Sequence, residues 1–322
     1  MSARLVTIFG GSGFVGRHLV RALAKDGWRI RVAVRRPDLA GHLQPLGAVG
    51  QIHAVQANLR YRDSVARAVQ GADAVVNLVG ILAESGRQKF ASVQAQGARV
   101  IAEEAAKAGI TNLVHLSAIG ADAASESDYA RSKGLGEAAV RAAVPSAVIL
   151  RPSIIFGPED QFFNRFANLA RFTPALPLIG GGETKFQPVF VGDVADAAKA
   201  ALNGLAKPGA TYELGGSETR SFKALLEYIL TVTGRKRMLV SLPFPIAKMQ
   251  ASVLELLPGK LLTVDQVKLL ETDNVVSAAA EAEGRTLAGL GIQPKTYEAI
   301  VPTYLYSFRE HGQFARAETA SN

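Results

Sequence analysis

The stretch Gly10-Gly11-Ser12-Gly13-Phe14-Val15-Gly16 follows directly on the apolar run Leu5-Val6-Thr7-Ile8-Phe9. A buried strand that turns sharply into a helix needs glycines, because a residue without a Cβ lets the backbone bend, approach a pyrophosphate and pack closely on the helix. Three of these glycines have the required spacing, and a helical pattern follows them. The stretch therefore predicts a dinucleotide-binding turn, in which the positive end of the helix meets the phosphates. The residues expected at the pyrophosphate are Gly10, Ser12, Gly13, Phe14, Val15 and Gly16.

The end of the next expected strand, residues 28–34, indicates which dinucleotide is bound. An acidic residue about 20 positions beyond the glycines binds the ribose hydroxyls of NAD, whereas arginine there suits the 2′-phosphate of NADP. Arg35 and Arg36 stand at that place. We therefore expect NADP(H), with NAD(H) the less favoured cofactor. The alternative interpretation is that both arginines are solvated surface charges.

Strand-like apolar runs alternate with helical patterns through the first half of the chain. The strands are expected at residues 5–9, 29–34, 51–56, 74–79, 112–117 and 147–151. This order predicts a parallel sheet that is covered on both faces by helices in right-handed crossovers. The fold class is therefore α/β, a doubly wound parallel sheet of the Rossmann type with a smaller C-terminal lobe.

The pattern changes beyond residue 157, where aromatic residues, prolines and a triple glycine become frequent. We expect a dinucleotide-binding domain over residues 1–157 and 188–215, and a smaller substrate or partner lobe over residues 158–187 and 216–310. Residues 311–322 are expected to form a disordered tail.

Composition limits the classes of protein that this chain can represent. Of its 322 residues, 48% are hydrophobic and 20% are charged, which is typical of a soluble globular protein. Its uncharged apolar runs are too short to cross a bilayer, and the early strand argues against a secretory signal, so a cytoplasmic location is expected. The absence of cysteine excludes disulfides and a cysteine nucleophile. The five histidines lack ligand spacing, so no metal is expected.

The net charge of +8 favours a polyanionic neighbour, such as a phosphorylated cofactor, an anionic membrane surface or an acidic protein. Nucleic acid is disfavoured, because the basic residues are scattered and are not interleaved with aromatic residues.

Three further residues suggest catalytic chemistry. Ser117 ends the fifth expected strand, and Tyr129 and Lys133 lie one turn apart on the same face of the helix that follows. An ammonium group beside a phenol lowers the pKa of the phenol, so that Tyr129 can exchange a proton with a carbonyl while hydride moves to or from nicotinamide. Ser117 would then hold the substrate oxygen.

With these residues the sequence resembles the short-chain dehydrogenase/reductase superfamily, in its extended or atypical branch. The matching segments are the glycine turn, Ser117, Tyr129 with Lys133, the run from Arg151 to Pro158, and Val191-Gly192-Asp193-Val194. The resemblance implies further cofactor contacts for Asn58 and Leu59 at the adenine, Val79 and Gly80 beside the nicotinamide ribose, Lys133, and Pro152 and Ile154 at the nicotinamide.

Two features depart from the usual pattern of extended members. Gln94 stands where those members usually have asparagine, and Tyr129 follows Ser117 by only twelve positions. Within the superfamily the chain is most similar to the nucleotide-binding accessory subunit of respiratory complex I and its bacterial relatives. The segments that carry this similarity are residues 115–120, 151–157, 186–189, 261–267 and 269–275. Members of that family hold NADPH as a structural element, on the peripheral arm near the membrane.

Two functions therefore stay open. The first is an accessory or assembly protein of complex I that holds NADP(H), with complex I subunits as partners and a peripheral place on the cytoplasmic face of the inner membrane. The second is an NADPH-dependent reductase or epimerase that acts on a small or nucleotide-linked substrate. The amphipathic residues 243–273, which include several lysines, would meet a partner or anionic headgroups in the first case. Alternatively, they pack on their own domain as a lid.

Overall fold

The structure, a computed structural model, describes residues 4–255, 262–310 and 312. The chain forms two compact units, each of which is described by itself. The first unit contains Met1–Ser153, Val191–Gly215 and Val276–Pro294, and the second contains Ile154–Phe190, Gly216–Val275 and Lys295–Asn322.

The first unit is built on a seven-stranded parallel sheet with the strand order β11-β6-β5-β4-β1-β2-β3. The order of strands confirms the predicted doubly wound sheet. Ile8 at the centre of the sheet is paired with Val32 and Val76, and all three are fully buried, as expected for strands covered on both faces. The strands are β1 (Leu5–Phe9), β2 (Arg29–Val34), β3 (Ile52–Gln56), β4 (Ala74–Asn77), β5 (Leu113–Leu116), β6 (Val148–Pro152) and β11 (Thr211–Leu214).

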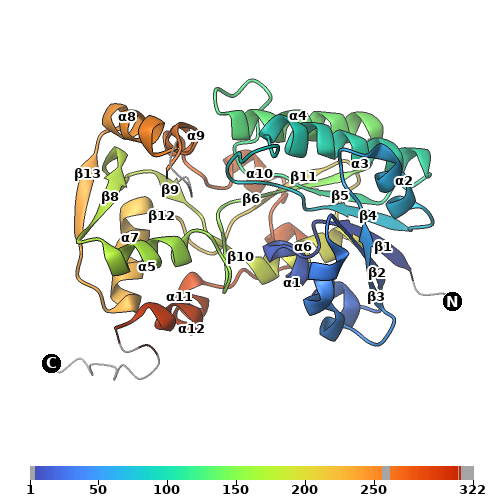
Figure 1. Cartoon of the computed structure of the whole chain (residues 1–322), viewed down its shortest axis with the longest axis horizontal. Coiled ribbons are helices and arrows are strands. Elements are labelled where there is room, and N and C mark those ends of the chain that lie inside the picture. The colour runs from blue at the N-terminus through green and yellow to red at the C-terminus, as the bar shows by residue number, and fades with distance from the viewer. Residues whose placement is uncertain (1–3, 256–261, 311, 313–322) are drawn as a thin grey trace. The chain divides into compact units, whose positions relative to one another are not determined.

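Helices cover both faces of this sheet (Figure 1). On one face α1 (Phe14–Lys25) packs on α6 (Val191–Leu202). On the other face lie α2 (Arg62–Val69), α3 (Gln96–Lys107) and α4 (Asp128–Ala143). Small residues let α4 closely approach α3 and the π-helical turn Ala91–Ala95 that directly precedes it. At Gly136, for example, a methyl group would lie 2.8 Å from the carbonyl oxygen of Gln94.

Residues 276–294 belong to the first unit, whereas the sequence predicted them to be part of the smaller lobe. Polar contacts with the edge strand β11 explain the difference. Glu213 accepts a hydrogen bond from the Ser277 amide at 2.8 Å, and its own amide donates to the Arg285 carbonyl at 2.9 Å. Arg285 also donates to the Thr211 carbonyl at 2.8 Å. This return segment, residues 276–294, contains the short helix α10 (Ala278–Ala282).

The second unit contains three pairs of short strands and six short helices among its described residues. The pairs are β7 (Ile155–Phe156) with β10 (Val189–Phe190), β8 (Ala175–Ile179) with β13 (Met238–Leu242), and β9 (Lys185–Phe186) with β12 (Arg220–Ser221). The helices are α5 (Phe163–Phe172), α7 (Phe222–Thr233), α8 (Phe244–Leu254), α9 (Val264–Leu269), α11 (Tyr297–Ile300) and α12 (Pro302–Leu305).

An aromatic core holds the second unit together, with Phe156, Phe163 and Phe222 almost fully buried. The buried carboxylate of Asp160 accepts a hydrogen bond from the Tyr304 hydroxyl at 2.6 Å, which connects the loop before α5 to α12.

Two predictions fall partly outside the described residues. The amphipathic stretch 243–273 includes residues 256–261, and the tail 311–322 is described only at Gly312. Within the described ranges, no helix combines the length and the apolar character needed to span a bilayer.

Gly16 sets how closely α1 crosses the glycine turn. A methyl group at this position would lie 2.5 Å from the Gly10 carbonyl oxygen and 2.5 Å from the Gly11 Cα. Both are backbone atoms, so the clash cannot be relieved by rotating a side chain. Glycine at position 16 is therefore required for the observed contact between the glycine turn and α1.

We expect Gly16→Ala to lower the free energy of unfolding by about 1–3 kcal/mol, because the helix and the turn must move apart. Chemical denaturation measures the effect. Gly41→Ala is the matched control, since a methyl group there meets no atom within 4 Å. If the two variants were equally stable, the close crossing at Gly16 would be refuted.

Candidate functional site

The glycine turn presents unused backbone amides at the N-terminus of α1. Gly10 adopts a φ of 82°, and a methyl group on it would lie 3.2 Å from the Leu78 carbonyl carbon, so glycine is needed there for both conformation and space. Helix α1 begins after Gly13, and no side chain of the described residues caps it. The amides of Phe14, Val15 and Gly16 are thus available to an anion, because first-turn amides have no partner within a helix.

The two arginines after β2 differ in their surroundings. Arg36 donates from Nε and Nη2 to the carboxylate of Asp38, at 3.0 and 2.6 Å. This contact raises the pKa of Arg36 and lowers that of Asp38. Arg35 is exposed and forms no ion pair with any residue that the structure describes. The two arginines are equivalent in the sequence-based prediction, which does not include the pairing of Arg36 with Asp38 two positions further along.

The expected adenine contacts follow β3. The Asn58 amide donates to Ser64 Oγ at 2.9 Å, and its side-chain oxygen accepts from the Arg60 amide at 3.1 Å. Leu59 packs against Gly97 of α3, where a methyl group would approach the leucine to 2.7 Å. These contacts fix the backbone of both residues at the carboxyl end of the sheet.

The loop after β4 is fixed by an asparagine for which the sequence predicted no role. Asn77 Oδ1 accepts a hydrogen bond from the Val79 amide at 3.0 Å, and its Nδ2 lies 3.1 Å from Nδ1 of His115 on β5. Both Asn77 and His115 are 2% exposed. Buried amide and imidazole groups in direct contact on neighbouring strands hold the loop, and with it Val79 and Gly80, in one position.

In the structure Lys133 reaches the end of β5, where Ser117 follows as the next residue. Lys133 Nζ donates to the Leu116 carbonyl at 3.1 Å and lies 6.0 Å from the ring centre of Tyr129, one turn earlier on α4. The Ser117 hydroxyl is buried, and it has no hydrogen-bond partner among the described residues. Phe90 packs edge-to-face on the Tyr129 ring at a centroid distance of 5.7 Å, which limits the orientation of the phenol.

Burial controls the charges of this group. Desolvation lowers the pKa of Lys133 to about 8, an effect that the nearby Glu137 partly opposes. Desolvation also lowers the pKa of His115 to about 3, with a further contribution from the Lys133 charge. His115 is therefore neutral at physiological pH, and Lys133 is the titratable group of the cluster in that range.

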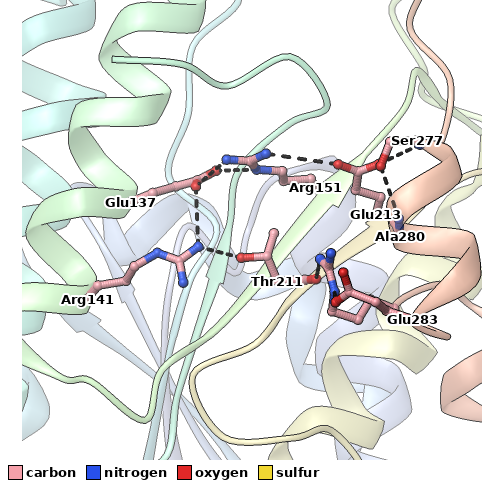
Figure 2. A network of polar contacts seen from close by, with 9 residues as sticks. Glu137, Arg141, Arg151, Thr211, Glu213, Ser277, Ala280 and Glu283 are labelled. Atoms are coloured by element: carbon pink, nitrogen blue, oxygen red, sulfur yellow. Dashed lines mark hydrogen bonds and ion pairs between the residues drawn. The ribbon is translucent and has the colours of Figure 1, made fainter. Parts of the chain in front are cut away.

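Glu137, one turn after Lys133 on α4, belongs to a polar network that Figure 2 shows. Arg151 on β6 donates from Nε and Nη2 to the two carboxylate oxygens of Glu137, at 2.8 and 2.7 Å. The same guanidinium lies 4.0 Å from the carboxylate of Glu213 on β11, which holds Ser277 of the return segment. The network thus joins the helix that carries Lys133 to two strands and to the return segment.

The last two predicted site residues, Pro152 and Ile154, belong to different units. Pro152 ends β6, and its carbonyl accepts a hydrogen bond from the Ile119 amide at 3.0 Å within the first unit. Ile154 belongs to the second unit, where its carbonyl accepts from the Val189 amide at 2.9 Å. The other predicted site residues lie in the first unit, along the carboxyl ends of its parallel strands.

The geometry fits a dinucleotide. A parallel sheet with this strand order, a glycine turn with unused amides and polar side chains after β4 and β5 define a dinucleotide-binding protein of the Rossmann class. The Ser117 hydroxyl, which has no partner in the described part of the chain, supports the same conclusion, because buried polar atoms in proteins normally have a partner.

Comparison with known proteins gives the family. The profile of the NAD dependent epimerase/dehydratase family matches residues 6–215. The chain therefore belongs to this family, whose members bind NAD(P). A solved dTDP-glucose 4,6-dehydratase from Streptomyces venezuelae, which is 21% identical, superposes with a TM-score of 0.70 over 94% of this chain and 95% of that one. At this identity the likeness shows the fold alone.

Two curated relatives extend the comparison. Subunit 9 of the NADH dehydrogenase [ubiquinone] 1 alpha subcomplex from Arabidopsis thaliana, a mitochondrial protein, is 34% identical over 326 residues, which cover 97% of this chain and 80% of that protein. The ceramide reductase of Caulobacter vibrioides is 40% identical over 175 residues, which cover 54% of each chain.

The lowered pKa of Lys133 gives a testable dependence of stability on pH. From about pH 8 to 10.5, the unfolded chain holds a proton that the folded protein lacks, so this lysine makes the folded state more stable as pH rises. Lys133→Met abolishes this titration. The stability of the variant relative to the natural protein should therefore fall by about 3 kcal/mol across that range.

Denaturant unfolding of both proteins at each pH measures the difference, in which the other titrating groups cancel. Ser132→Ala, a neutral change at the adjacent buried residue, should follow the natural protein throughout. A pH-independent difference for Lys133→Met would refute the burial of the ammonium group.

Proposed function

We propose that this protein holds NADP(H) as an accessory subunit of respiratory complex I. The observation that carries the proposal is the similarity to the subunit 9 relative, which extends over 97% of this chain and so reaches beyond the family region 6–215. The sequence similarity therefore includes the part of the chain beyond residue 215, which the family profile does not match. The partners of the protein would be other subunits of the complex.

The location follows from the same proposal. The protein would sit peripherally on the cytoplasmic face of the inner membrane, as part of the arm of the complex that projects from the membrane. The net charge of +8 supports contact with acidic subunits or anionic headgroups at that place.

Each part of the nucleotide would meet a specific group of the chain. The amides at the start of α1 would hold the pyrophosphate, and Asn58 and Leu59 would border the adenine. Val79, Gly80, Pro152 and Ile154 would border the nicotinamide half. When bound, NADPH supplies a transferable hydride, but in the proposed role it serves as part of the folded structure. Ser117, Tyr129 and Lys133 would then anchor the nicotinamide end through hydrogen bonds.

We propose NADP(H) as the preferred form because Arg35 and Arg36 follow β2. The two arginines are expected to contribute unequally. Arg35 forms no ion pair within the described part of the chain, whereas the charge of Arg36 is already balanced by Asp38. A phosphate on Arg36 therefore competes with a carboxylate.

Arg35→Ala should therefore weaken NADPH binding by about 1–3 kcal/mol, and Arg36→Ala should weaken it less. Asp38→Ala releases Arg36 and should strengthen NADPH binding. Calorimetric titration with NADPH, and with NADH as the control ligand that lacks the 2′-phosphate, measures these effects. Equal losses for NADPH and NADH in the arginine variants would show that neither guanidinium binds the 2′-phosphate.

The proposed role predicts both a partner and a retained nucleotide. A tagged chain, expressed in its native organism, should co-purify with NADH:ubiquinone oxidoreductase subunits from membranes solubilised in mild detergent. Denaturation of the preparation should release NADPH in a near-stoichiometric amount, which mass spectrometry detects. Recovery of the tagged chain without those subunits would contradict the accessory role, and recovery without any nucleotide would contradict the structural use of NADPH.

A second candidate function is an NADPH-dependent reductase or epimerase. It is supported by the placement of Lys133 between Tyr129 and the end of β5, and by the 40% identity to a ceramide reductase over 175 residues. In this case Tyr129 would give a proton to a substrate carbonyl held by Ser117. Turnover that Tyr129→Phe abolishes, with unchanged NADPH affinity, would establish this function; an unreactive bound NADPH favours the first.

A further inference from the structure

Arg31 is a partly buried cation in the sheet of the first unit to which the roles above assign nothing. It lies in the middle of β2, paired with Thr7 of β1 and with His53 of the edge strand β3. Its Nη1 donates to the carbonyls of Ala68 and Gln70 at 2.7 and 2.8 Å. These two bonds hold the guanidinium at the C-terminal end of α2, where a positive charge is favoured.

The other edge of the same guanidinium is unused. Within the described ranges Nε and Nη2 of Arg31 have no acceptor, and neither atom is buried, so both are accessible to a ligand. Arg36 and Arg151 show what this edge binds, because each donates from Nε and Nη2 to one carboxylate. Desolvation and the nearby charge of Arg29 lower the pKa of Arg31, so the chain itself under-compensates this charge.

Arg31 borders a cavity of about 300 Å³, and two more arginines lie around it. The other residues that line the cavity are Val55, Gln56, Arg67 and Ala68. Arg67, on α2, and Arg29, two residues before Arg31 on β2, are both exposed. Neither side chain forms an ion pair or a hydrogen bond with any residue that the structure describes. We call Arg29, Arg31 and Arg67 the arginine cluster.

The spacing within the arginine cluster fits an extended acidic segment. Arg29 and Arg31 are on the same face of β2, because side chains alternate along a strand, and two residues of strand span about 6.6 Å. Carboxylates at alternate positions of an extended polypeptide repeat at the same distance. A small organic ligand fits less well, since such ligands bind between mainly apolar walls and only Val55 and Ala68 are apolar here.

We propose that the arginine cluster binds an acidic segment of a partner protein, in which one carboxylate accepts hydrogen bonds from Nε and Nη2 of Arg31. Arg29 and Arg67 bind neighbouring carboxylates of the same segment. The site is separate from that of the cofactor phosphate, because Arg35 lies four residues, or about 13 Å of strand, beyond Arg31. That the partner is another subunit of the complex rests on the proposed function.

The experiment measures the binding of two peptides by calorimetric titration, in the presence of excess NADPH. One peptide alternates threonine with glutamate, and the other has glutamine in place of each glutamate. The natural chain should bind the glutamate peptide at least about tenfold more tightly than the glutamine peptide. Arg31→Met should lose most of this preference, because the Nε–Nη2 edge is gone.

The exposed arginines supply the graded variants and the control. Arg29→Gln and Arg67→Gln should each weaken binding of the glutamate peptide by about two- to fivefold, since exposed ion pairs contribute less than partly buried ones. Arg21→Gln is the matched control. It removes an exposed arginine of α1 that forms no ion pair within the described part of the chain, and it should bind the peptide as the natural chain does.

Three results would overturn the proposal and leave the proposed function standing. They are a natural chain without preference for the glutamate peptide, full affinity in both Arg29→Gln and Arg67→Gln, and displacement of the peptide by inorganic phosphate at equal concentration. The last result would assign the arginine cluster to a free anion. These two variants keep the test decisive even if Arg31→Met does not fold. Failure of the natural chain to co-purify with complex I subunits would contradict the proposed function alone, since the peptide titration does not depend on it.

Discussion

The site depends on a lysine ammonium group that is held inside the protein at the end of a parallel strand. Lys133 loses most of its hydration there, and the Leu116 carbonyl is a neutral partner that replaces only part of it. Glu137 supplies the nearest opposing charge, one turn away on the same helix, but Arg151 binds both of its oxygens. The charge of Lys133 is thus left under-compensated by the chain. A buried cation with spare donors is suited to hold a polar ligand.

The segments around the buried Lys133 are held in place by polar contacts and by close helix packing. The strands place Asn77 beside His115, and the asparagine in turn fixes the loop that contains Gly80. On the opposite side, close helix packing at Gly136 holds the π-helical turn with Gln94. Polar side chains in these positions tolerate burial because most of their atoms are paired. Among the described residues, the Gln94 Oε1, His115 Nε2 and Ser117 Oγ atoms are buried without a partner.

The sheet and its glycine turn could be predicted from sequence because their signals are local. Apolar runs of strand length, glycines at fixed spacing and the Tyr129–Lys133 interval depend only on neighbours in the chain. Three features escaped prediction for the opposite reason. The pairing of Arg36 with Asp38 depends on loop geometry, the contact between Asn77 and His115 on strand pairing, and the free oxygen of Gln94 on three segments that meet only in the fold. The return segment was also misassigned, since its bonds to Glu213 connect residues 64 positions apart in the chain.

The return segment has a further consequence for how the gene can be shortened. Since the chain leaves the first unit after Gly215 and re-enters it at Val276, neither unit is one uninterrupted length of polypeptide. A stop codon before residue 276 would leave the edge strand β11 without the backbone bonds that Ser277 and Arg285 provide. The C-terminal third of this protein therefore cannot be treated as an appendage, and expression of the nucleotide-binding half alone requires the excised middle to be bridged by a linker.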